Sequence, residues 1–278
     1  MDGFTIRDGY VNLNQFEEPN FALRSGAGVL INTVGGGAIV TLNNCILTNN
    51  ESTYAAGALA NTRTTHNITI NNSLIFNNEA DQIGAMFFRG DEVVTISNTT
   101  IANNDSSGGP DSDIFCLDPA LFTITNSILW DTDGGDDNQI QVGAGTSNFE
   151  YSLIRGFDLT GSNGLDGTNP ASDPLFTNPA VNDFTLQTGS PVIDLGDNTA
   201  VTQLTDLNGN VRIVDGNGDT ITNVDFGAFE APFVPDTTPP VITCPAAITE
   251  DCIINVITYP FPTATDNVDA FVFIVNNI

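Results

Sequence analysis

The feature that most constrains this chain is an internal repeat with a period of about 27 residues. Four eleven-residue segments, beginning at residues 40, 68, 94 and 122, align without gaps. In each copy, apolar residues flank a threonine, as in Val40–Leu42 and Val94–Ile96. This alternation predicts a short β-strand with one buried face and with threonine on the other face. A weaker copy follows at residue 148, and an earlier one begins at Phe4.

An asparagine and a small residue follow each of these predicted strands. Asparagine tolerates the left-handed conformation that a sharp corner needs, and stacked side-chain amides can hydrogen-bond from one repeat to the next. A second apolar segment precedes each copy, so one period holds two or three short strands joined by corners. The corner pairs are Asn44-Cys45, Asn72-Ser73, Asn98-Thr99 and Asn126-Ser127.

A single repeat of this kind cannot bury its own apolar face, whereas a stack of repeats can. Helix formers are scarce and lysine is absent, so an α-helical fold is effectively excluded. Leucine-rich repeats, the competing solenoid, would need a Leu-x-x-Leu-x-Leu pattern that the chain lacks. We therefore expect an all-β fold: a right-handed parallel β-helix of about six rungs over residues 1–157.

Two degenerate tetrads recur within the repeats. Ala56–Leu59 and Ile83–Met86 are variants of Gly-Gly-Ala-Ile, and Ile46–Asn49 and Leu74–Asn77 are variants of Phe-x-x-Asn without the phenylalanine. In these tetrads the chain resembles the parallel β-helix repeats of polymorphic outer-membrane proteins and related bacterial surface proteins. The resemblance implies a secreted or cell-surface location in a bacterium.

The composition changes after the repeats. Residues 158–231 are rich in Asp-Pro, Asn-Pro and glycine without a period, and we expect them to form an irregular cap over the open end of the coil. Residues 232–240 form a proline-rich linker. Residues 241–278 resemble the start of a hyalin-repeat (HYR) module, which implies part of an immunoglobulin-like β-sandwich.

The four cysteines fall into two pairs with different expectations. Cys45 and Cys116 lie in the repeats more than two rungs apart, so they are expected to be buried and not bridged to each other. Cys244 and Cys252 lie in the HYR-like segment and could form a disulfide in an oxidising compartment.

The charge balance excludes several classes of partner. Six arginines against 34 acidic residues give a net charge of −28, which disfavours nucleic acid and anionic membrane surfaces. No apolar run is long enough for a membrane-spanning helix, so we expect no membrane insertion. A lyase acting on anionic sugars would need a cationic cleft that six arginines can hardly build. His66, the single histidine, is predicted in a polar surface loop, and no catalytic residue is assigned.

Three groups of residues are candidate binding sites. Asp215, Asn217 and Asp219 have the spacing of a calcium loop, although a plain turn explains them as well. The loop containing Asp133 and Asp136 could hold a catalytic carboxylate pair or be a solvated corner. The candidate ligand surface has two parts. The first is the threonine row Thr41, Thr69, Thr95 and Thr123, for which an ordinary exposed strand face is the alternative. The second is the aromatic pair Phe76 and Trp130, which could stack on carbohydrate or pack against the coil.

These observations favour a non-catalytic structural or adhesive module of a secreted or surface-anchored bacterial protein. Its expected partners are extracellular polysaccharide or neighbouring protein subunits, and calcium is the single cofactor considered. The alternative is a carbohydrate-binding or polysaccharide-degrading β-helix protein, that is, a lyase or a glycoside hydrolase.

Overall fold

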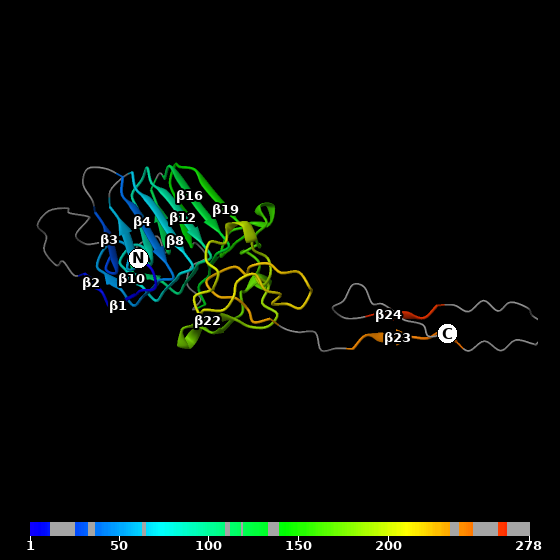
Figure 1. The fold of residues 1–278 in the computed structure, drawn as a ribbon. Coiled ribbons are helices and arrows are strands. Elements are labelled where there is room, and N and C mark those ends of the chain that lie inside the picture. The colour runs from blue at the N-terminus through cyan, green and yellow to red at the C-terminus, as the bar shows by residue number, and fades with distance from the viewer. Residues whose placement is uncertain are drawn as a thin grey trace, which may run out of the picture.

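The structure is a computed structural model, and it describes residues 1–11, 26–32, 37–62, 65–108, 112–117, 119–132, 139–233, 239–246 and 261–265. The described strands coil into a parallel β-solenoid (Figure 1). Each strand of the coil pairs in parallel with the equivalent strand of the neighbouring turn or turns, in four sheets. Within these described residues the structure contains almost no helix, as the composition predicts.

Two of the sheets meet at the asparagine corner. The threonine sheet contains β4 (Ile39–Asn43), β8 (Asn67–Asn71), β12 (Val93–Ser97), β16 (Leu121–Thr125) and β19 (Ser147–Glu150). The covered sheet contains β1 (Thr5–Arg7), β5 (Ile46–Thr48), β9 (Leu74–Phe76), β13 (Thr100–Ala102), β17 (Ile128–Leu129) and β20 (Leu153–Ile154).

The other two sheets complete the wall of the coil. The acidic sheet contains β2 (Tyr10–Val11), β6 (Glu51–Ser52), β10 (Glu79–Ala80) and β14 (Asp105–Ser106). The fourth sheet contains β3 (Val29–Ile31), β7 (Leu59–Asn61), β11 (Met86–Phe88), β15 (Ile114–Cys116) and β18 (Ile140–Val142).

The coil makes about four turns, and the expected six rungs are not confirmed. Among the four sheets described, the covered sheet is the one that stacks six strands. The first and last turns lack a strand in at least one other sheet within the described part of the chain.

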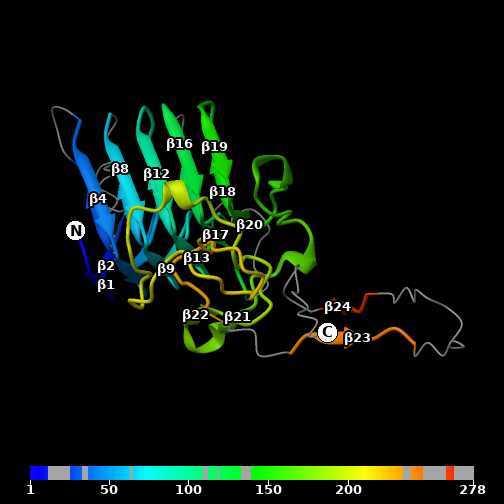
Figure 2. The same ribbon diagram turned by 45° about the vertical axis from the view of Figure 1, so that its right-hand side comes forward.

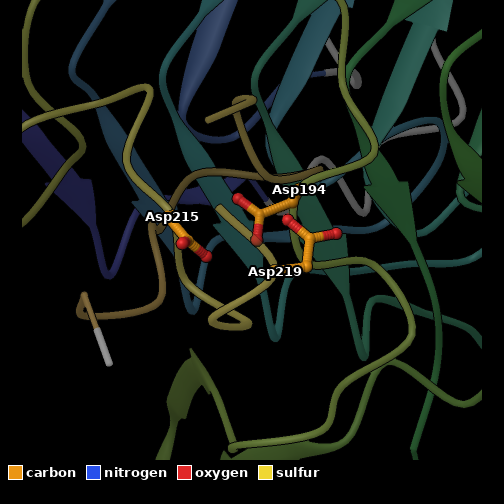
Figure 3. Close-up of side chains that lie close together, drawn as sticks. All are labelled: Asp194, Asp215 and Asp219. Carbon is orange, nitrogen blue, oxygen red and sulfur yellow. The ribbon is translucent and has the colours of Figure 1, made fainter. Parts of the chain in front are cut away.

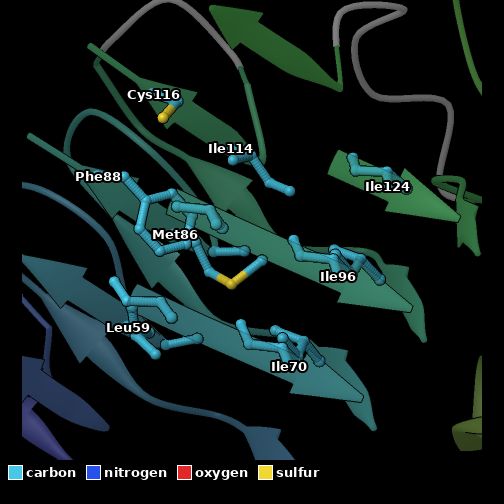
Figure 4. Close-up of a cluster of buried hydrophobic side chains, with 14 of the residues drawn as sticks. Leu59, Ile70, Met86, Phe88, Ile96, Ile114, Cys116 and Ile124 are labelled. Carbon is cyan, nitrogen blue, oxygen red and sulfur yellow. The ribbon is translucent and has the colours of Figure 1, made fainter. Parts of the chain in front are cut away.

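The predicted strand register is confirmed in the threonine sheet. Thr69 pairs with Thr41 on one side and with Thr95 on the other, and Thr95 pairs in turn with Thr123. The alternate residues point into the coil, where Ile70 and Ile96 meet Met86 and other side chains of the fourth sheet (Figure 4). These inward side chains are fully buried. Cys45 and Cys116 also lie in this core and are not joined to each other, as predicted.

The asparagine corners are confirmed as well. Asn44, Asn72, Asn98 and Asn126 have φ angles of 53°, 51°, 48° and 50°, in the left-handed region. Their amides stack: Asn72 Nδ2 donates to Asn44 Oδ1 at 2.5 Å, and Asn126 Nδ2 donates to Asn98 Oδ1 at 3.2 Å. The small residue after each asparagine also has a role, because the Ser73 hydroxyl accepts a hydrogen bond from Cys45 N and donates one to Asn71 O.

Only the first part of the segment 158–231 closes the end of the coil. Leu165 N donates to Ser152 O and Tyr151 N donates to Ser162 O, so residues 158–168 lie along the last turn, and Leu159 enters the core. The segment continues through η2 (Thr160–Ser162), η3 (Pro170–Ser172), β21 (Phe176–Asn178), η4 (Pro179–Val181), β22 (Asp183–Leu186) and η5 (Asn198–Ala200), with β21 and β22 antiparallel.

The remainder, residues 173–231, lies along the side of the coil, and we call it the side segment (Figure 2). It packs on the outward side chains of the covered sheet, where the Phe76 and Phe184 rings lie 5.3 Å apart. Gly227 makes this close approach possible: it has φ +95°, and a Cβ there would lie 2.6 Å from Thr100 Oγ1. The expected end cap is therefore mainly a lateral cover.

The immunoglobulin-like segment is not confirmed. Its described part is a two-stranded antiparallel hairpin of β23 (Val241–Thr243) and β24 (Thr263–Thr265). Cys244 is exposed and is a free cysteine, so the Cys244–Cys252 disulfide that the sequence allowed is not formed in this structure. Cys252 itself lies outside the described residues.

Candidate functional site

The side segment brings three carboxylates together. One oxygen each of Asp194, Asp215 and Asp219 lies within 4.8 Å of the others, and the three side chains converge (Figure 3). Asp194 and Asp215 are buried, while Asp219 is exposed. Three carboxylate oxygens at this spacing are hard ligands of the kind that Ca²⁺ prefers.

Backbone N–H groups hold two of these carboxylates in place. Asp215 accepts from Gly218 N at 2.6 Å and from Thr220 N at 2.9 Å. Asp194 accepts from Gly216 N at 3.1 Å and from Asn217 N at 3.0 Å. Burial raises the pKa of Asp194 despite these hydrogen bonds, and the negative charges of Asp215 and Asp219 act in the same direction. A cation would relieve this repulsion.

The predicted calcium spacing is only partly reproduced in the cluster. The structure joins Asp215 and Asp219, whereas the Asn217 side-chain oxygen accepts a hydrogen bond from Asp219 N at 2.9 Å. Asp194 was not predicted as a member. It precedes Asp215 by a long non-periodic stretch, and no local spacing in the sequence marks it.

An open groove of about 640 Å³ lies beside the carboxylate cluster, and we call it the corner groove. Tyr151, Asn163 and Leu165 line it from the last turn of the coil. Asp194, Leu195 and Asp197 line it from the side segment. Asp194 thus belongs to both the groove and the cluster.

A second set of charged groups is sealed inside the side segment. Arg212 Nη1 donates to Glu230 Oε1 at 2.6 Å, and both side chains are 1% exposed. Arg212 also donates to Asn72 Oδ1 on the coil, so this buried cation joins the two parts of the fold. Burial raises the pKa of Glu230 to about 8 and that of Asp225 to about 7, and the Arg212 charge opposes both shifts. Asp225 accepts hydrogen bonds from Asp194 N and Ala231 N, one on each carboxylate oxygen, so both oxygens hold the backbone.

The structure separates the predicted ligand-surface residues into two groups. Thr41, Thr69, Thr95 and Thr123 form a half-buried outward row. Phe76 and Trp130 are each 7% exposed beneath the side segment, so of the two alternatives for these rings, carbohydrate stacking and packing against the coil, the structure has the packing. The continuous apolar stretch Leu74–Phe76 was a signal for this burial, because a strand that alternates has one solvent face and this one does not.

The remaining sequence candidates also have definite places. His66 is 1% exposed, not a surface residue, because it lies in a corner where its Nδ1 accepts from Ala38 N at 2.9 Å. Asp133 and Asp136 lie outside the described residues.

No family model, no curated protein and no solved structure matches this chain. The described residues also include no helix of the length and apolar character needed to cross a membrane.

Proposed function

We propose that this chain is a non-catalytic module of a secreted or surface-anchored bacterial protein, acting in adhesion or extracellular assembly. The supporting observation is the position of Glu230 and Asp225, the two carboxylates of the side segment whose pKa is raised furthest. Glu230 and Asp225 are buried and bound to Arg212 or to backbone N–H groups, so they stabilise the side segment and do not face a substrate. The accessible surface is instead built from regular strand faces such as the threonine sheet.

The finer features of the proposal follow from the sequence. We propose a right-handed course for the coil, membership of the polymorphic outer-membrane-protein-like group, and an HYR module beginning in residues 241–278. Extracellular polysaccharide or neighbouring subunits are the proposed partners, with no nucleic acid and no membrane insertion, in keeping with the charge of −28.

A panel of insoluble and soluble polysaccharides tests the non-catalytic role. We expect the chain to be retained on a polysaccharide or to sediment as an oligomer, without new reducing ends or unsaturated uronate. Product formation would establish the alternative, a lyase or glycoside hydrolase. Absence of retention, of oligomers and of products together would contradict the adhesive role.

We also propose that calcium binds at Asp215, Asn217 and Asp219 together with Asp194. The convergence of the three carboxylates supports this second proposal. Addition of CaCl₂ should raise the Tm and saturate at about one equivalent. Asp219→Asn should abolish that rise, while Asp105→Asn, an exposed control, should keep it. A shallow rise that does not saturate and is the same in both variants would reduce the effect to charge screening.

A further inference from the structure

The asparagine column at the corner of the coil ends in a tyrosine. In register after Asn98 and Asn126 comes Tyr151, which has φ +47°. Asparagine adopts this left-handed conformation readily, whereas a bulky aromatic residue there is strained. Such strain persists where the surrounding structure imposes it, and it is concentrated at functional positions.

The strained position places the Tyr151 side chain in the corner groove. The groove volume of about 640 Å³ lies within the range of small-ligand sites. Tyr151 is half-buried and Asn163 is exposed. Within the part of the chain that the structure describes, neither the Tyr151 hydroxyl nor the Asn163 side-chain amide has a hydrogen-bond partner. The Tyr151 ring packs in part against the hydrophobic cluster between the side segment and the covered sheet, and it lines the groove together with the two unused polar groups.

The opposite wall supplies hydrogen-bond acceptors. Asp197 Oδ2 accepts one hydrogen bond, from Thr199 Oγ1 at 2.9 Å, so it has further lone pairs available. Asp194 also lines the groove, with the Asp215 and Asp219 carboxylates close by. This concentration of negative charge favours a ligand that donates hydrogen bonds and disfavours an anion.

We propose that the corner groove binds a short uncharged oligosaccharide. One sugar ring lies with its C–H face on the Tyr151 ring, and its hydroxyl groups donate to Asp197 and exchange hydrogen bonds with Asn163. In calcium-free solution, the carboxylates of Asp194 and Asp197 and those of the neighbouring cluster exclude uronate-containing chains. The inference deepens the proposed adhesive role and rests on it for the extracellular setting.

The test is calorimetric titration of the full chain with neutral oligosaccharides and with matched uronate oligosaccharides. We expect binding of a neutral sugar and none of the uronate. Tyr151→Asn should weaken binding by about tenfold or more, equivalent to about 1.4 kcal/mol, because it removes the ring on which the sugar lies.

Two more variants keep the outcome decisive. Asp197→Asn retains the acceptor for Thr199 and should weaken binding by about threefold or more, and Tyr10→Ala, an exposed tyrosine on the first turn, should leave it unchanged. Absence of binding at about 10 mM neutral sugar, or equal affinity of wild type and Tyr151→Asn, would overturn the proposal. Retention on polysaccharide that survives Tyr151→Asn would leave the adhesive role standing and remove only this groove from it.

Discussion

The threonine sheet and the covered sheet are adjacent walls of one coil, yet they meet different surroundings. Strands of the threonine sheet alternate apolar and polar residues, as in Val94–Ser97, and one face reaches solvent. Strands β9, β17 and β20 of the covered sheet are apolar on both faces, and both faces are buried. The number of apolar columns in a repeat therefore indicates which wall of a solenoid carries a covering layer.

The largest effect is expected from removal of the Phe184 ring, which covers the outward side chains of the covered sheet. Its side chain is 1% exposed and contacts the rings of Phe76 and Phe176, each at 5.3 Å. Phe184→Ala should lower the free energy of unfolding by about 4 kcal/mol, since it leaves a cavity between the side segment and the covered sheet. Urea unfolding followed by the fluorescence of Trp130, the single tryptophan, measures the loss.

Thr95→Ala on the open face is the matched control and should change stability by less than about 0.5 kcal/mol. Equal losses from the two substitutions would show that the covered sheet is not more deeply packed than the threonine sheet.

The next test breaks the charged contact between the side segment and the coil. Arg212→Met should cost about 3 kcal/mol, because it leaves the buried Glu230 carboxyl group and the Asn72 side-chain oxygen without their donor. Arg212→Met combined with Glu230→Gln should recover part of the loss in the same unfolding measurement. Arg7→Met removes an ion pair whose side chains are 68% and 67% exposed and should be nearly neutral. If Arg212→Met left the free energy of unfolding unchanged, the contact would contribute nothing to the packing of the side segment on the coil.

The third test uses pH. Burial raises the pKa of Glu230 to about 8, that of Asp225 to about 7 and that of Glu92, inside the coil, to about 7. The folded chain keeps these protons at pH values where the unfolded chain has lost them. Stability is therefore greatest near pH 4 to 5 and falls by about 2 kcal/mol as pH rises through 7 to 8.

Thermal unfolding from pH 5 to pH 8 measures this fall. Glu92→Gln should flatten the profile, since it removes the contribution of the coil and leaves that of the side segment. A Tm that increases steadily from pH 5 to pH 8 would be opposite in sign to this prediction.

The smallest effect is expected in the acidic sheet, which, like the threonine sheet, has one face in solvent. Glu51, Glu79 and Asp105 are paired in register on adjacent strands, and all three are exposed. Like charges directly opposite one another destabilise a sheet. Glu79→Gln should raise the Tm by about 1 °C at low salt, and the gain should disappear in high salt, as scanning calorimetry can show. A gain that is independent of salt would point to a cause other than charge.

The coil was predictable because each repeat sees the same neighbours. Thr69 and Asn72 recur in fixed columns, so strand, corner and register follow from periodicity alone. The position of the side segment has no such signal, since residues 173–231 do not repeat. His66 shows the same limit on a smaller scale, because its burial depends on accepting a hydrogen bond from Ala38 one turn away.

The candidate site was only half predictable for a related reason. Asp215 and Asp219 share a loop, and their spacing is visible in the sequence. Asp194 reaches them through a fold of the side segment, and Tyr151 meets Asp197 only because that segment returns to the last corner of the coil. Contacts of this kind depend on tertiary packing, which local spacing does not encode.

The contacts between the side segment and the corner asparagines fix the number of turns. Arg212 binds Asn72, and Asp197 N donates to Asn126 Oδ1 at 2.8 Å, two turns farther along the coil. An extra repeat between these corners would displace one of them by about 4.8 Å, beyond hydrogen-bond reach. Solenoids commonly change length when a repeat is duplicated or lost, since each repeat contacts only its neighbours. The side segment therefore fixes the number of turns between Asn72 and Asn126. The coil can gain or lose repeats only before Asn72 without breaking its contacts with the side segment.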